Sequence, residues 1–207
     1  MVSLQGYSSQ LSEALSLVDQ AAVDRLYQRI LFTLEAGNTI YLFGNGGSHA
    51  NAHHIAGDYQ KSLALLGFPA KVFCPTDNSC YLTAASNDID YTESFSLTIG
   101  PIVSPNDFVI YLSGSGNSMN LVKCSTKCRE QGIYQASLTA FQGGRISKIV
   151  DLSIHIPIAD MEIAEDCQII IFHFIKQRLT EYISTTMGSS RVHADKYLRR
   201  ISEDNVA

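Results

Sequence analysis

Two Gly/Ser-rich segments, Gly44–Ser48 and Ser113–Ser118, hold residue types that could bind a charged ligand. Each follows a short apolar run and precedes a helical pattern. Glycines allow the backbone to approach a ligand closely, and the first turn of a helix offers free N–H groups at its positive end. With the serine hydroxyls, these groups form a phosphate site that needs no lysine. The alternative interpretation is a tight turn with a serine N-cap.

The first loop adds Asn45, whose amide could donate to a sugar hydroxyl or to a phosphate. This loop is not GxGxxG, and no acidic residue follows about twenty residues later at a strand end. A dinucleotide site is therefore weakly supported. The loop is not GxxxxGK[ST] either, which argues against a nucleotide P-loop.

Ionisable residues follow the first loop and recur late in the chain. His54 and Asp58 are four residues apart, so one helical face carries both. They could share a metal ion or form a plain hydrogen-bonded pair. Glu165 and Asp166 precede an apolar run that contains His173, and a histidine in such a run is typical of a core. Glu165 and His173 are separated by about 12 Å of helical rise, so one ion could bind both only with both side chains stretched toward it.

The five cysteines are odd in number and form no CxxC pair, which predicts reduced thiols in a cytoplasmic protein. Cys124 and Cys128 are four residues apart and could hold a metal, although buried cysteines are common in any core. The other histidines have no obvious partners and are expected at the surface or in caps: His49, His53, His155 and His193.

Periodicity and Gly/Asn breaks predict alternating helices and strands. Helices are expected over about 8–36, from the first loop to 62, over 79–86, from Ser118 to 131, over 145–150 and over 163–183. Strands are expected over 39–43, 71–74, 108–112, 134–139 and 152–158. This alternation predicts an α/β fold with a parallel sheet covered on both faces. Ligands of such sheets bind beyond the carboxyl ends of the strands, where both loops lie.

Composition predicts one globular domain over 1–207, with a core at about 39–185 and a polar tail at about 186–207. A net charge of −5 argues against a broad nucleic-acid surface. The sequence contains no run of about 18 apolar residues, so no membrane-spanning helix is expected. The first residues lack the pattern of a signal peptide.

Four motifs occur in a specific order: Gly44–His49, Ser86–Asp88, Ser113–Ser118, and Ala164–Gln168 with His173 after it. This order and spacing resemble the SIS (sugar isomerase) domain family, and within it the phosphoheptose (sedoheptulose 7-phosphate) isomerases, over about residues 8–185. The resemblance implies a three-layer α-β-α sandwich of flavodoxin-like type with five mainly parallel strands and a long N-terminal helix. It also implies a zinc-dependent cytoplasmic homotetramer of heptose biosynthesis, with active sites at subunit interfaces.

The resemblance further implies roles for individual residues. The positions that match the substrate-binding residues of the family are Asn45, Gly46, Gly47, Asn87, Asp88, Ser113, Ser115 and Ser118. Ser48 and Gly114 in the same two loops, and Glu165, complete the residues expected to bind substrate. The four positions that match its zinc ligands are His54, Asp58, Glu165 and His173. The catalytic acid–base pair of the family matches His173 and Asp58.

This chain departs from the family pattern at several of those positions. The family usually has Glu at position 58 and Gln at position 165, and many members have Arg where this chain has Ser62 beside Lys61. Gly114 occupies the middle of a loop that often reads Ser-Thr-Ser. Shortening Glu to Asp withdraws the carboxylate by roughly 1.5 Å, and misplacement of about 1 Å can cost about 10²-fold in rate. We therefore hypothesise that the base or metal-ligand role has partly shifted from Asp58 to Glu165.

Aldose–ketose isomerisation through an enediol needs a base, an acid and stabilisation of an oxyanion. A carboxylate from Asp58 or Glu165, the imidazole of His173 and a zinc ion acting as a Lewis acid would meet these needs. One alternative is an isomerase of another sugar phosphate. The other is a non-catalytic SIS adaptor that binds the replication initiator protein, which would share the loops.

Overall fold

The structure is a computed structural model that describes residues 3–186. Its centre is a sheet of five parallel strands in the order β2-β1-β3-β4-β5. The strands are β1 (Ile40–Phe43), β2 (Val72–Phe73), β3 (Phe108–Ser113), β4 (Tyr134–Thr139) and β5 (Leu152–His155). The sheet therefore confirms the α/β class and the strand number expected from the sequence.

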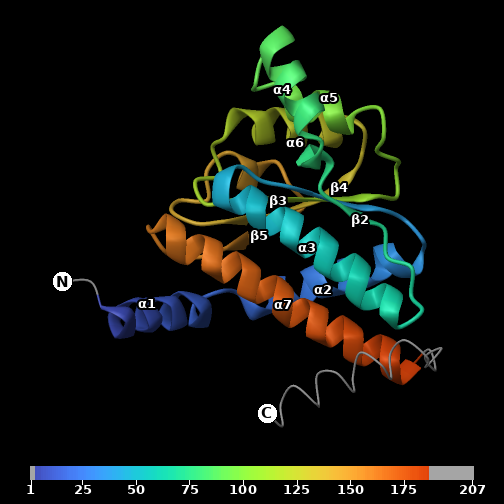
Figure 1. The fold of residues 1–207 in the computed structure, drawn as a ribbon. Helices are drawn as coiled ribbons and strands as arrows, with labels where there is room; N and C mark the ends of the chain where they lie inside the picture. Colours follow the sequence, from blue (N-terminus) through green and yellow to red (C-terminus); the bar gives the residue numbers. More distant parts are fainter. Residues whose placement is uncertain (1–2, 187–207) are drawn as a thin grey trace.

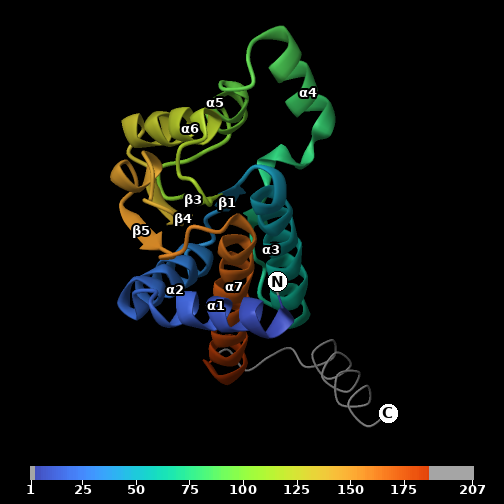
Figure 2. The same ribbon diagram turned by 90° about the vertical axis from the view of Figure 1, so that its left-hand side faces the viewer.

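Helices cover both faces of this sheet (Figures 1 and 2). The longer ones are α1 (Leu4–Ser16), α2 (Gln20–Glu35), α3 (Gly46–Leu65), α4 (Ser79–Asp88), α5 (Ser94–Ile99), α6 (Met119–Glu130) and α7 (Met161–Thr186). Two single turns of 3₁₀-helix are η1 (Pro75–Asp77) and η2 (Ile146–Lys148). Figure 2 shows α5 and α6 on one face, and α2, α3 and α7 on the other, with α1 packed outside α7.

The side chains of β1 alternate between two hydrophobic cores. Ile40 and Leu42 join the larger core under α2, α3 and α7, whereas Tyr41 and Phe43 join the smaller core under α5 and α6. All four side chains are buried. Because both faces of the strand are covered, it is encoded as an uninterrupted apolar run instead of an alternating one.

The N-terminal helix expected over 8–36 is wrong as a single element, because the chain forms two helices there. Asp19 lies between them with an extended backbone, and its carboxylate accepts a hydrogen bond from the N–H of Ala21 at 2.9 Å. This N-cap begins α2 independently of α1. Leu15 and Val18 continue the apolar spacing up to the break, and both pack against the larger core. Periodicity alone therefore did not reveal where α1 ends.

Several smaller differences separate the observed elements from the expected ones, and three of them concern whole elements or strand ends. Helix α5 was not expected, η2 is one turn where 145–150 was expected to be helical, and β5 ends at His155 instead of 158. Helix α4 projects beyond the strands (Figure 1). The expected tail lies, from residue 187 onward, outside the described residues. Among residues 3–186, no helix has the length and apolar character needed to span a membrane.

Candidate functional site

A cavity of about 220 Å³ lies where the two Gly/Ser-rich loops meet at the carboxyl ends of β1 and β3. Both loops line it, together with two residues from the start of α7. The lining residues are Asn45, Gly46, Gly47, Ser48, Leu112, Ser113, Gly114, Ser115, Ser118, Met161 and Glu165. Nine of the eleven substrate-binding positions inferred from the sequence are therefore brought to one cavity, as the topology of a parallel sheet predicts.

The first loop is held by a network of amides. Asn45 and the buried Asn120 exchange two side-chain hydrogen bonds of 3.0 and 2.9 Å, and the Tyr91 hydroxyl donates to Asn45 Oδ1 at 2.6 Å. Asn45 is also the N-cap residue of α3, although its side chain makes no capping bond. Its amide is thus oriented by α6 and by the segment before α5 instead of by its own helix.

The second loop is shaped by its own serines. Ser113 Oγ accepts a hydrogen bond from the N–H of Gly116 at 3.1 Å, and Ser115 Oγ accepts one from the N–H of Asn117 at 3.2 Å. Ser118 is the N-cap residue of α6, and its hydroxyl makes no capping bond. That hydroxyl and the N–H groups of Met119 and Asn120 are consequently available to an anion, whereas the N–H of Leu121 already donates to Asn120 Oδ1 at 3.0 Å. The Ser113 and Ser115 hydroxyls accept within the loop and can still donate.

Close contact between glycines sets the path of this second loop. Gly116 has a left-handed backbone with φ of +62°, and a Cβ there would collide with the Gly143 carbonyl group. A Cβ on Gly144 would in turn collide with the backbone of Ser115 and Gly116. The N–H of Ile146 also donates to the Gly116 carbonyl at 3.0 Å. The loop after β4 therefore supports the loop after β3 backbone to backbone.

Glu165 extends from α7 into the cavity beside the first loop. Its Oε1 accepts from Ser48 Oγ at 3.4 Å, and a Cβ on Gly47 would lie 2.5 Å from its Cδ. Asn51 donates to the Glu165 carbonyl at 2.9 Å, which ties α3 to α7 at this level. Only a glycine at position 47 leaves room for this carboxylate.

A second group of ionisable residues lies further along the same two helices. His54 and Asp58 from α3 meet His173 from α7, and one ligand atom from each lies within 4.8 Å of the other two. The two imidazole Nε2 atoms are 3.1 Å apart. Since His173 is partly exposed and faces His54, it is not the core histidine that its apolar neighbours suggest. Glu165 is not part of this group, because its carboxylate faces Gly47 and Ser48 instead.

Asp58 in that group also binds a lysine. Lys176 Nζ donates to Asp58 Oδ2 at 2.6 Å, Lys61 Nζ lies 3.7 Å from Oδ1, and Ser62 Oγ donates to Oδ1 at 3.3 Å. Burial alone would raise the pKa of Asp58, but the hydrogen bond and charge of Lys176, with help from Lys61 and Ser62, hold it below its ordinary value. Burial, His54 and the charge of Lys176 together lower the pKa of His173, against an opposing effect of Asp58.

The donor set of this group fits a zinc ion. Two imidazole nitrogens on one tetrahedral zinc, each at about 2.0–2.1 Å, lie roughly 3.3 Å apart, close to the 3.1 Å between His54 and His173. A carboxylate is the usual third ligand of such sites, and an open fourth position is typical of catalytic zinc. The ammonium of Lys176 competes for the Asp58 carboxylate, so metal binding would require Asp58 to exchange one partner for the other.

Two inferred substrate positions lie away from the cavity. Asn87 and Asp88 end α4, where Asn87 Nδ2 donates to Asp88 Oδ1 at 2.9 Å, and both side chains are exposed. Sequence reasoning missed several residues that shape the site: Asn51, Tyr91, Asn120, Met161 and Lys176. Only Lys176 had a usable signal, because it is three residues after His173 and so shares its helical face.

Comparison with protein families gives a match to the SIS domain over residues 6–140. A curated phosphoheptose isomerase from Aneurinibacillus thermoaerophilus is 33% identical over 173 residues, which cover 83% of this chain and 84% of that protein. One from Chlorobaculum parvum is 32% identical over 187 residues, covering 88% and 87% respectively. These relatives support the expected enzyme class, an aldose–ketose isomerase.

Among solved structures, a phosphoheptose isomerase from Francisella tularensis has a similar fold. It superimposes with a TM-score of 0.80 over 87% of this chain and 100% of that chain, at 18% identity. At that identity the likeness concerns the fold alone, and it agrees with the five-stranded parallel sheet described above.

Proposed function

The chain belongs to the SIS domain family, and from this premise we propose that it is a sugar-phosphate isomerase that interconverts sedoheptulose 7-phosphate and the corresponding aldose 7-phosphate. The observation that carries the proposal is the cavity in which both Gly/Ser-rich loops and the Glu165 carboxylate meet. A phosphate-binding loop beside a carboxylate is what proton transfer on an anchored sugar phosphate requires. The similar curated proteins are named phosphoheptose isomerases, which supports a heptose phosphate as the substrate.

The second loop would anchor the substrate phosphate. Ser113 and Ser115 hold the loop in shape by accepting hydrogen bonds through their hydroxyl oxygens, while the Ser118 hydroxyl and the N–H groups of Met119 and Asn120 would donate to the phosphate. Binding energy gained at this remote group would orient the reacting carbons. The amide of Asn45, held by Asn120, would contact the sugar hydroxyls.

Glu165 is proposed as the base and Asp58 as a metal ligand. Glu165 opens onto the cavity, whereas the largely buried Asp58 of α3 already contacts Lys61 of its own helix and Lys176 of α7. In the forward step a carboxylate takes the proton from the hydroxyl-bearing carbon next to the carbonyl, and the carbonyl oxygen gains a proton. The enediol then loses its other hydroxyl proton as the neighbouring carbon is protonated, which leaves the aldose.

His173 is proposed to serve the substrate oxygens during these proton transfers. It lies about two turns, roughly 12 Å of helical rise, beyond Glu165 on α7, so the two side chains would have to extend toward each other along the helix to reach the same carbons of the sugar. A zinc ion held by His54, Asp58 and His173 would supply Lewis-acid polarisation of the carbonyl oxygen.

We also propose that the active protein is a cytoplasmic homotetramer. Large apolar side chains are exposed on α7 and around α4, among them Phe174, Ile170, Ile89 and Tyr91. Such side chains are typical of surfaces that bury against another subunit. Light scattering of the purified protein at several concentrations measures the assembly directly, and a monomer at all of them would contradict it.

The test is turnover of sedoheptulose 7-phosphate by the purified full-length protein, with its metal content measured in parallel. We expect bound zinc and turnover in the wild type, and a loss of turnover in Glu165→Gln. Glu162→Gln, an exposed carboxylate in the first turn of the same helix, is the matched control and should keep wild-type activity.

Each negative outcome separates the proposal from one alternative. Zinc without turnover would favour an isomerase of another sugar phosphate, a possibility suggested by Asp58 and Glu165 at the altered positions. Neither zinc nor turnover would favour the non-catalytic adaptor. Full activity in Glu165→Gln would contradict Glu165 as the base and would favour Asp58 in that role.

A further inference from the structure

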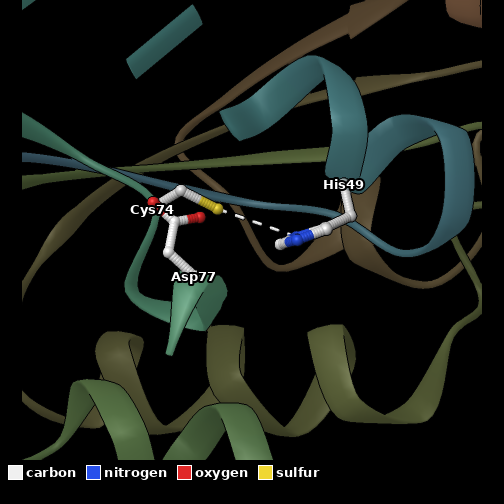
Figure 3. A group of neighbouring side chains, drawn as sticks. All are labelled: His49, Cys74 and Asp77. Atoms are coloured by element: carbon white, nitrogen blue, oxygen red, sulfur yellow. Dashed lines mark hydrogen bonds between the residues drawn. The ribbon is translucent and has the colours of Figure 1, made fainter. Parts of the chain in front are cut away.

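A second group of metal-ligating side chains lies between α3 and the segment after β2. His49 comes from the first turn of α3, Cys74 follows β2 directly, and Asp77 ends η1. One ligand atom from each lies within 4.8 Å of the other two. Figure 3 shows the Cys74 thiol and the Asp77 carboxylate approaching the His49 ring from the same segment.

The separation of the donors suits a single ion. Cys74 Sγ lies 3.7 Å from His49 Nδ1. A sulfur and a nitrogen bound to one tetrahedral zinc, at about 2.3 Å and 2.0–2.1 Å, lie roughly 3.5 Å apart. The two atoms are therefore already close to the spacing that zinc imposes, with no change of backbone.

Neighbouring residues complete the surroundings of the group. His53, one turn after His49 on the same helical face, contacts Asp77 Oδ1 through its Nδ1 at 2.7 Å. This contact orients the carboxylate in the way that outer partners of metal ligands do. The Thr76 hydroxyl lies 3.1 Å from His49 Nδ1 and 3.4 Å from Cys74 Sγ, so it contacts both of these donors and would be displaced or bound by an ion.

We propose that His49, Cys74 and Asp77 bind a zinc ion, with His53 as the positioning residue of Asp77. A thiolate, an imidazole and a carboxylate together select a borderline-soft divalent ion such as zinc over magnesium or calcium. The site is separate from the one formed by His54, because His53 and His54 leave α3 toward different neighbours: the segment after β2 and helix α7.

The ion would connect the cavity to the segment that leads into α4. His49 directly follows Ser48 of the first loop, and Cys74 and Asp77 flank the 3₁₀ turn that precedes α4. A bond through the metal would thus fix the first turn of α3, and with it the first loop, against the edge of the sheet formed by β2. The role is structural and does not depend on the isomerase proposal.

The experiment uses the full-length protein loaded with Co²⁺ in place of zinc. A thiolate bound to Co²⁺ gives a charge-transfer absorption in the near ultraviolet, and among the two groups described only the second contains a cysteine. We expect this band in the wild type, its loss in Cys74→Ser, and its retention in Cys80→Ser. Cys80 is an exposed cysteine at the start of α4 and is the matched control.

Zinc content of the same proteins gives a second readout. Cys74→Ser and His49→Gln should each release one equivalent of zinc fewer than the wild type, whereas His54→Ala should keep the thiolate band. Because Cys74 is buried and its substitution could disturb folding, Asp77→Asn, at an exposed carboxylate, tests the same site with less risk. Absence of the band from Co²⁺-saturated wild type, or its persistence in Cys74→Ser, would overturn the proposal. Wild-type protein that shows the thiolate band but does not turn over sedoheptulose 7-phosphate would count against the isomerase proposal only.

Discussion

Replacement of Gly47 by alanine tests whether the position of the Glu165 carboxylate matters for catalysis. The added Cβ would lie closest to Glu165 Oε2, with Cδ at 2.5 Å and Oε1 at 2.7 Å, whereas ordinary contacts begin near 3.4 Å. The carboxylate must therefore move by about 1 Å or more. Since a displacement of that size can cost about 10²-fold in rate, we expect kcat to fall about 100-fold, equivalent to about 2.7 kcal/mol of transition-state stabilisation.

Stability should hardly change in this variant. The obstructing group is the far end of a flexible side chain, and the backbone of Gly47 is not in the left-handed region. Gly57→Ala is the matched control, because this glycine lies on the same helix with no atom within 4 Å of an added Cβ. We expect Gly57→Ala to keep wild-type kinetics and to gain up to about 1 kcal/mol in stability from helix propensity.

The assay is steady-state turnover of sedoheptulose 7-phosphate, with thermal unfolding in parallel. A change confined to KM would mean that Gly47 contributes only to substrate binding. The sharper comparison places Gly47→Ala in the Glu165→Gln background, where it should cost much less than in the wild type because both changes act on one group. Wild-type kcat in Gly47→Ala, or an equal loss in both backgrounds, would refute the reasoning.

Three further predictions concern the phosphate loop, the first metal group and the core. Ser118→Ala should raise KM for the phosphorylated substrate about tenfold, because it removes a hydroxyl that we propose to bind the phosphate. The melting temperature should change little, because this hydroxyl makes no capping bond. An unchanged KM would show that the hydroxyl does not contact the phosphate. Lys176→Met should tighten zinc binding about tenfold, because it frees Asp58 from an ion pair between partly buried charges. Competition with a chelator measures the affinity. Weaker zinc binding would mean that Lys176 orients the Asp58 carboxylate for the metal. Asp107→Ala should lower the free energy of unfolding in urea by about 2–4 kcal/mol, because this buried carboxylate accepts two backbone N–H bonds of 2.8 Å, and a loss below about 1 kcal/mol would indicate that water replaces it.

The sequence predicted the sheet because its strands are short apolar runs that end in turn residues. The expected strand 134–139 coincides with β4, and the two Gly/Ser-rich loops follow β1 and β3 as expected. The break at Asp19 was missed because the apolar spacing of α1 and α2 continues across it. A capping residue acts locally, and its signal is weak beside a long periodic pattern.

The site was predicted less completely than the fold. The residue types and their positions after apolar runs identified the two loops. The direction of the Glu165 side chain, however, depends on the absence of a side chain at Gly47, which lies on another helix. The role of Asn120 depends on a contact across 75 positions of the chain. His49 was expected at the surface or in a cap, because its partners Cys74 and Asp77 come from a strand end that only the three-dimensional structure brings to it. Such long-range neighbours leave no periodic signal.

The contact between Gly116 and Gly144 has a consequence for how substrate affinity could vary among related chains. We propose no substrate contact for any side chain of the loop after β4. Its backbone nevertheless packs against the phosphate loop and fixes the path of that loop. An insertion or a bulky residue at positions 143–144 would therefore alter anion affinity at a distance, through the spacing of two main chains. Sequence comparisons restricted to ligand-contacting positions would overlook this source of divergence, and directed evolution of substrate preference could exploit it.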